Sequence, residues 1–71
     1  MPNNVYKVIQ IIGTSGKSWE DAARTAVETA AKSLHDLRIA EVVEQDMQLE
    51  NGKVVGFRVK LNVSFKFEDK D

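Results

Sequence analysis

The chain has 71 residues with 10 basic and 11 acidic side chains, so its formal net charge is −1. This balance gives no electrostatic reason to expect a nucleic-acid partner. The absence of cysteine excludes disulfides and thiolate metal sites. Because a chain of this size buries only about 60% of its unfolded surface, we expect a single domain, residues 1–71, that gains stability by oligomerisation.

The start of the sequence lacks a basic region followed by an apolar run, and no apolar stretch approaches the length of a membrane span. We therefore expect a cytoplasmic protein without a membrane partner.

A strand and a helix are predicted in the first half of the chain. Residues 5–12 are rich in β-branched side chains and predict a strand that ends at Gly13. Residues 13–17 have the composition of a loop, and Ser18 with Asp21 forms a capping pair. We expect the helix to run to about His35. Its apolar side chains, many of them alanine, recur at three- and four-residue spacing: Trp19, Ala22, Ala23, Ala26, Val27, Ala30, Ala31 and Leu34.

Two further strands are predicted over residues 38–49 and 55–67. In the second of these, apolar and polar residues alternate, which is typical of a strand with one buried face. At ~3.3 Å per residue this strand reaches roughly 40 Å, whereas a compact chain of this length has a diameter near ~30 Å. The strand must therefore bend, overhang or pair with another copy, which favours self-assembly.

The turn between these strands leaves two registers open. A two-residue loop at Asn51 and Gly52 would pair Glu44 with Val59 and place a carboxylate on the apolar face. A three-residue loop over residues 50–52 pairs Glu44 with Arg58. We favour the three-residue loop because it keeps charge opposite charge.

The order of elements is β-α-β-β. A right-handed crossover lays the first two strands parallel, and the last strand can then lie between them, antiparallel to both. The expected fold class is α+β, a three-stranded antiparallel sheet packed on one helix. The other face of the sheet has no cover within the chain.

Two motifs suggest chemistry that the spacing does not support. Residues 13–18 end in Gly-Lys-Ser, but a phosphate loop needs glycine where Ile11 stands, which leaves only a weak anion site at Lys17 and the helix start. His35 is the only histidine and fits a partner of the helix dipole.

Trp19 fits a core anchor better than a ligand-stacking role. No nucleophile is paired with a base, so we expect no catalytic residue and no enzyme.

Polar oxygen-bearing side chains alternate along one face of the second strand: Glu44, Asp46, Gln48 and Glu50. They fit a ladder opposite the basic side chains of Arg58 and Lys60. They also suit a hard cation such as Ca²⁺ or Mg²⁺, although no EF-hand spacing is present and such a site would have to be assembled between subunits.

Taken end to end, the chain resembles the dodecin family. The segments that carry the resemblance are Gly13-Thr14-Ser15, the helix, Ile39-Ala40-Glu41-Val42-Val43-Glu44-Gln45, the hairpin, and Val63-Ser64-Phe65-Lys66-Phe67-Glu68. The resemblance implies a hollow homododecamer in which other copies cover the open face of the sheet. Many dodecins bind stacked flavins at subunit interfaces, as stores rather than as enzymes.

The sequence departs from this family at both flavin contacts. Flavin-binding members have a stacking tryptophan where this chain has Ile39, and a hydrogen-bonding glutamine where it has Arg58. An isoleucine offers no π-face, and an arginine only donates hydrogen bonds. The variant looks more like the non-flavin branch, which includes calcium-binding dodecins.

We therefore expect a non-enzymatic, homo-oligomeric binding or storage protein for a small ligand or a divalent cation such as Ca²⁺. Its metal ligands would be Glu44 and Asp46. Binding of FMN or riboflavin at an atypical site, or a purely structural shell, are the alternatives.

Overall fold

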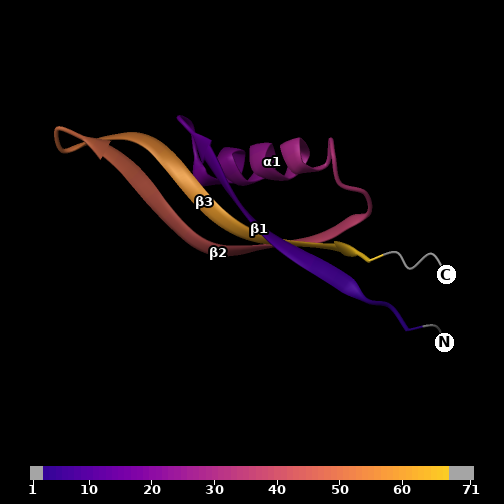
Figure 1. Ribbon diagram of the computed structural model, residues 1–71. Coiled ribbons are helices and arrows are strands. Elements are labelled where there is room, and N and C mark those ends of the chain that lie inside the picture. The colour runs from indigo at the N-terminus through magenta and orange to yellow at the C-terminus, as the bar shows by residue number, and fades with distance from the viewer. Residues whose placement is uncertain (1–2, 68–71) are drawn as a thin grey trace.

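The computed structural model describes residues 3–67, and the predicted fold class is confirmed (Figure 1). The elements follow the order β1 (Tyr6–Ser15), α1 (Trp19–Ala30), β2 (Leu37–Glu50) and β3 (Lys53–Lys66). The sheet has the strand order β1-β3-β2, and β3 is antiparallel to both neighbours. Glu68, the last residue of the dodecin-like C-terminal segment, lies outside the described residues.

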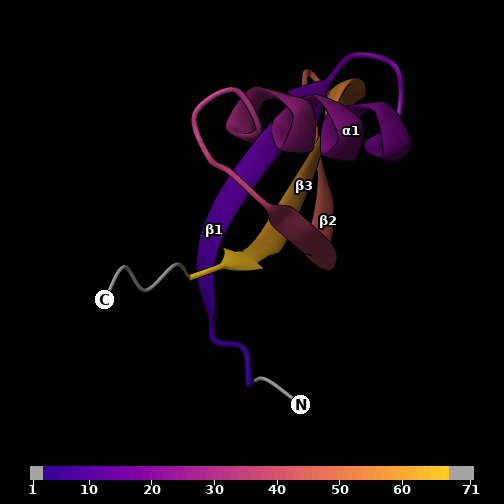
Figure 2. The same ribbon diagram turned by 90° about the vertical axis from the view of Figure 1, so that its right-hand side faces the viewer.

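The core lies between α1 and the face of β3 that points toward it. Val59, Leu61 and Val63 are each 1% exposed, and they meet Ala22 and Ala26 of the helix. Figure 2 shows α1 crossing one side of the sheet, and no other helix or strand of residues 3–67 covers the opposite side. The small alanine side chains allow the helix to lie close to the strands, as the sequence predicts.

The sequence predicts that the first strand ends at Gly13. In the structure β1 continues to Ser15. A Cβ atom at Gly13 would collide with the carbonyl oxygen of Ala22 and lie 2.7 Å from the Cβ atom of Ala26. Glycine is therefore needed at this point because the helix backbone approaches the strand, and not because the chain turns.

The predicted start of α1 is confirmed, and its predicted end is wrong. The Ser18 hydroxyl accepts a hydrogen bond from the backbone N–H of Asp21 at 3.0 Å. The helix ends at Ala30. Beyond it, the N–H of Ser33 donates to the carbonyl oxygen of Ala30 at 3.1 Å, a three-residue spacing that is tighter than the four-residue spacing of an α-helix. His35 therefore lies in the connection to β2 and is no partner of the helix dipole. No helix within residues 3–67 is long and apolar enough to cross a membrane.

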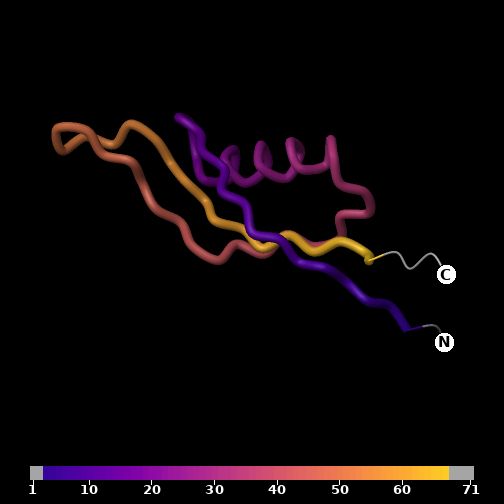
Figure 3. The backbone as a smooth tube through the Cα atoms, in the orientation of Figure 1, coloured from indigo at the N-terminus to yellow at the C-terminus, as the bar shows by residue number. Residues whose placement is uncertain are grey.

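The hairpin of β2 and β3 extends well beyond the helix. Figures 1 and 3 show the two strands curving together and projecting past α1 and the end of β1. The molecule measures 55 × 20 × 15 Å, and its radius of gyration is 14.9 Å, compared with about 11 Å for a compact chain of this length. Of the three alternatives predicted for the last strand, the single chain shows bending and overhang, and pairing with another copy stays a prediction.

The predicted three-residue loop is wrong. Asn51 and Gly52 have φ values of 53° and 76°, as in a two-residue turn of type I′. The regular register of such a turn is then shifted by a bulge, because Gln48 pairs with Gly56 whereas Leu49 pairs with Val54.

The bulge decides which charged residues meet. The extra residue in β3 places Glu44 opposite Lys60 and Asp46 opposite Arg58. The predicted pair of Glu44 with Arg58 is therefore wrong, although the physical reason for it holds. Carboxylates do lie opposite basic groups, one pair further along the ladder than the sequence suggested.

Candidate functional site

The charged ladder lies on the open face of the sheet, opposite the helix. Alternation along β3 buries Val59 and Leu61 on the helix side and turns Arg58 and Lys60 to the other side. A small pocket of about 130 Å³ is formed there. Its lining residues come from all three strands: Ile12, Glu44, Asp46, Arg58 and Lys60.

Asp46 and Arg58 form the most tightly constrained contact of the pocket. The Nε and Nη2 atoms of Arg58 donate to the two carboxylate oxygens of Asp46, at 2.7 and 2.8 Å. Such two-point contacts fix the geometry of both groups. The hydrogen bond from Arg58 holds the pKa of the Asp46 carboxyl below its usual value, against a smaller opposing effect of desolvation. The same bond raises the pKa of the Arg58 guanidinium.

Glu44 and Lys60 form a looser pair beside it. The Nζ atom of Lys60 lies 3.1 Å from one carboxylate oxygen of Glu44, whose side chain is 63% exposed. This contact is made at one point and by a flexible side chain. The pocket thus contains two carboxylates, of which Asp46 is held at both oxygens and Glu44 at one.

Trp19 supports the backbone of the site from the helix side. Its indole Nε1 donates to the carbonyl oxygen of Asp46 at 3.0 Å. The ring also meets Phe57 edge-on, with centroids 5.1 Å apart and an interplanar angle of 71°. Trp19 packs against the core, which confirms the core-anchor interpretation. Its contact with Asp46 could not be predicted from the sequence, beyond the general need of a tryptophan N–H for an acceptor.

The two positions that match the flavin contacts of the family are not brought together within one chain. Ile39 is 66% exposed on the open face and lies opposite Ser64, whereas Arg58 lies six residues away along β3. At ~3.3 Å per residue this separation is roughly 20 Å. Two of the five N–H donors of Arg58, at Nε and Nη2, moreover bond to Asp46.

The weak anion site at the helix start is not supported. The Ser15 hydroxyl accepts the backbone N–H of Lys17 at 2.9 Å and donates to a carboxylate oxygen of Asp21 at 2.7 Å. A backbone donor is therefore used inside the loop, and a carboxylate occupies the place where an anion would bind.

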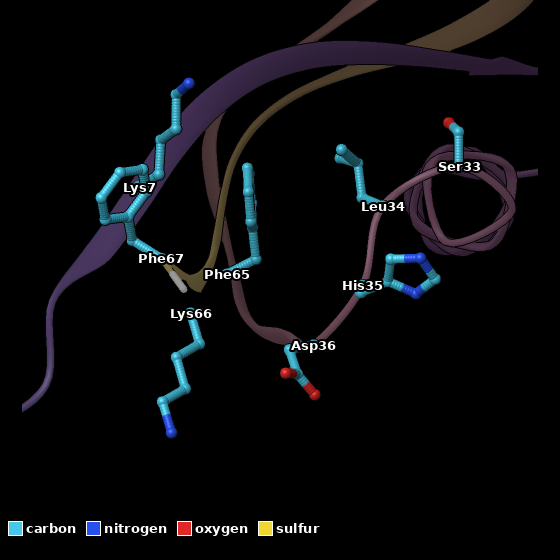
Figure 4. A pocket seen from close by; sticks show the side chains of 8 residues that line it. All are labelled: Lys7, Ser33, Leu34, His35, Asp36, Phe65, Lys66 and Phe67. Carbon is cyan, nitrogen blue, oxygen red and sulfur yellow. The ribbon is translucent and has the colours of Figure 1, made fainter. Parts of the chain in front are cut away.

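A second hollow of about 310 Å³ lies at the other end of the sheet, between β3 and the connection that follows α1 (Figure 4). Leu34 and Phe65 border it, while Asp36 and Lys66 point away. Within residues 3–67, no three side chains of Asp, Glu, His or Cys come together as a metal-binding group. A cation held by Glu44 and Asp46 would need further ligands from water or from another subunit.

Comparisons with known proteins show what the chain is similar to in sequence and fold. Residues 5–68 match the family model Dodecin. The chain is 54% identical over 63 residues to calcium dodecin from Mycobacterium tuberculosis (strain ATCC 25618 / H37Rv), a match that covers 89% of both chains. The crystal structure of a calcium dodecin from that species, described as calcium chelating with a novel calcium-binding site, has a TM-score of 0.81 at 51% identity and covers 94% of this chain and 96% of that one. The dodecin structure from Streptomyces coelicolor has a TM-score of 0.91 at 34% identity and covers 99% of this chain and 100% of that one.

Proposed function

The chain belongs to the dodecin family, and from this premise we propose that it is a non-enzymatic homododecamer that binds a divalent cation such as Ca²⁺ at its subunit interfaces. The observation that carries the proposal is the pair of carboxylates, Glu44 and Asp46, in one pocket at an edge strand of the sheet. The resemblance to calcium dodecin supports the choice of cation.

The donor set suits calcium. Ca²⁺ takes six to eight oxygen ligands in flexible geometry, and carboxylates are its usual protein ligands. Every residue of β2 after Leu37 is exposed, including Glu44 and Asp46, so a second subunit or water can reach both carboxylates. The cation would supply charge neutralisation between subunits, while Glu44 and Asp46 would hold it by their oxygens.

Assembly is supported by the large apolar side chains that the single chain leaves in solvent. They are spread over the three strands and the residues next to them: Val5, Tyr6, Val8, Ile12, Ile39, Val42, Val43, Met47, Leu49, Val54, Val55 and Phe67. The pairing of β1 with β3 places Tyr6, Val8 and Ile12 on the open face. Exposed apolar patches mark interaction sites. Twelve copies of the 8.0 kDa chain correspond to a native mass of about 96 kDa, which native mass spectrometry measures directly.

Calcium titration of chelator-treated protein by calorimetry tests the cation. We expect saturable binding, weakened about tenfold or more by Glu44→Gln, because the substitution removes one charged oxygen ligand and keeps the side-chain shape. The matched control is Glu28→Gln, which removes an exposed carboxylate of α1. A wild-type protein that binds no Ca²⁺ would overturn the proposal, and equal losses in both variants would place the effect outside the pocket.

Flavin binding is the alternative that the same protein can test. Ile39 offers no aromatic surface for a flavin ring, and Arg58 is held by Asp46. We therefore expect riboflavin and FMN to keep their fluorescence when the protein is added. Strong quenching at micromolar protein would favour flavin storage over cation binding.

A further inference from the structure

The carboxylates of the pocket already have cationic partners. Both oxygens of Asp46 accept from Arg58, and one oxygen of Glu44 contacts Lys60. Two negative and two positive side chains thus line about 130 Å³. An incoming cation meets no excess of negative charge in this pocket, and it has to compete with the guanidinium for the carboxylate oxygens of Asp46.

We infer that Arg58 is an internal competitor for the cation, and that its two-point contact with Asp46 sets the affinity of the site. The inference rests on the proposed function. Cation uptake is then an exchange in which Asp46 passes from the guanidinium to the metal. No covalent step is involved, and the displaced guanidinium stays on the open face with its donors released.

The geometry explains why Arg58 is the competitor and Lys60 is secondary. A planar guanidinium fits a carboxylate with two parallel hydrogen bonds, whereas an ammonium on a flexible stem acts as a point charge. The distances follow this difference, since Arg58 contacts Asp46 at 2.7 and 2.8 Å and Lys60 contacts Glu44 once, at 3.1 Å.

The competition acts on every cation. A cation binds Asp46 only in the fraction of molecules in which the guanidinium has released it, so Arg58 lowers the apparent affinity for Na⁺, K⁺ and Ca²⁺ by the same factor. Ca²⁺ remains the stronger ligand, because its attraction to a carboxylate at the same distance is twice that of a monovalent cation. Added K⁺ should weaken Ca²⁺ binding less while the guanidinium already occupies the carboxylate.

Trp19 provides a local signal for the exchange. It is the only tryptophan of the chain, and its indole N–H donates to the carbonyl oxygen of Asp46. Its emission is therefore sensitive to movement of this segment of β2, and it complements the calorimetric measurement.

Three variants test the competition in calcium titrations of the assembled protein. Arg58→Gln should raise the affinity for Ca²⁺ about fivefold or more, since it removes a two-point ion pair. Arg58→Lys should give an intermediate affinity, because lysine keeps the charge and loses the planar fork. The control Arg24→Gln removes an arginine from the exposed ion pair with Glu20 and should leave the affinity within about twofold of the wild type. In Arg58→Gln, added KCl should also weaken Ca²⁺ binding more than in the wild type at equal ionic strength.

The outcomes separate this inference from the proposed function. If the wild type binds Ca²⁺ and Arg58→Gln binds it equally or more weakly, Arg58 is not a competitor. If Arg58→Lys equals the wild type, only net charge matters and the two-point contact is irrelevant, which overturns the inference even when Arg58→Gln does not assemble. If no protein in the series binds Ca²⁺, the proposed function fails and this inference fails with it.

Discussion

The two faces of β3 differ in what the single chain supplies to them. On the helix side, Val59, Leu61 and Val63 are each 1% exposed and packed against α1. On the open side, Arg58 and Lys60 alternate with these residues and form ion pairs with the carboxylates of β2, in a pocket that is open to solvent. One strand therefore contributes to the core on one side and, on the other side, to a charged surface that the single chain leaves uncovered.

This difference assigns separate roles to neighbouring residues. Burial of apolar side chains supplies most of the stability of a small domain, and the helix side of β3 provides it here. The exposed charge pairs of the open side contribute little to folding. The open side is thus free to carry function, and substitutions on the two faces should have different effects.

The largest effect is expected from Leu61→Ala. The side chain is 1% exposed in the core, and its truncation should destabilise the fold by about 2 to 5 kcal/mol, because it leaves a cavity under α1. Urea unfolding followed by circular dichroism measures this change.

The matched substitution is Asn62→Ala, one residue further on the open face, where Asn62 accepts a hydrogen bond from Gln10 at 3.0 Å. Because the contact is exposed, we expect a loss of at most about 1 kcal/mol. A loss as large as that of Leu61→Ala would mean that assembly buries the open face as fully as α1 buries the other, and the contrast between the faces would disappear.

A smaller effect is expected where α1 meets β1. Gly13→Ala places a methyl group against the carbonyl of Ala22, so the helix has to shift, at a cost of roughly 1 to 3 kcal/mol. Gly16→Ala is the control, because a Cβ atom there has no neighbour within 4 Å. If both substitutions have the same effect on the urea midpoint, the close approach of helix and strand does not contribute to stability.

Most of the fold could be predicted from the sequence because its signals are local. Alternation marked β3, the Ser18 cap marked the start of α1, and Asn51 with Gly52 marked the turn. The position of β3 between the other strands followed from the handedness of the crossover.

The sequence was misleading where tertiary contacts decide. The pattern predicts a strand end at Gly13, whereas the glycine there makes room for the helix. The predicted register differs from the observed one because the turn has two residues and the bulge at Val55 shifts the pairing once more. The signal was present in Val54 and Val55, two consecutive apolar residues that interrupt the alternation before Gly56.

The candidate site was predictable in composition but not in pairing. Alternation placed Glu44 and Asp46 on one face, and the structure places both in one pocket. The alternation in the sequence could not show that Arg58 holds both oxygens of Asp46, because this contact depends on the register of β2 and β3. Their role as metal ligands stays a prediction, as does the role of Ile39 and Arg58 at the positions of the family's flavin contacts.

The smallest expected effect is a pH dependence of the Asp46–Arg58 pair in metal-free protein. Hydrogen bonding to Arg58 lowers the pKa of the Asp46 carboxyl below 3.8. A group whose pKa is lower in the folded than in the unfolded state stabilises the fold above the unfolded pKa, and this contribution is lost as the pH falls through the folded pKa. The pair should therefore persist to a lower pH than an unpaired aspartate would stay ionised, and break as the pH falls through the lowered pKa of Asp46.

The carboxyl carbon of Asp46, followed by NMR between pH 2 and 6, should titrate with a midpoint below 3.8 in the wild type. In Arg58→Gln the midpoint should rise, because the charged donor is lost while partial desolvation of the carboxyl remains. Equal midpoints would mean that the guanidinium does not hold the carboxylate in solution. Arg58 could then not compete with a cation for Asp46, and the charge pairs of the open face would be no more than solvated surface.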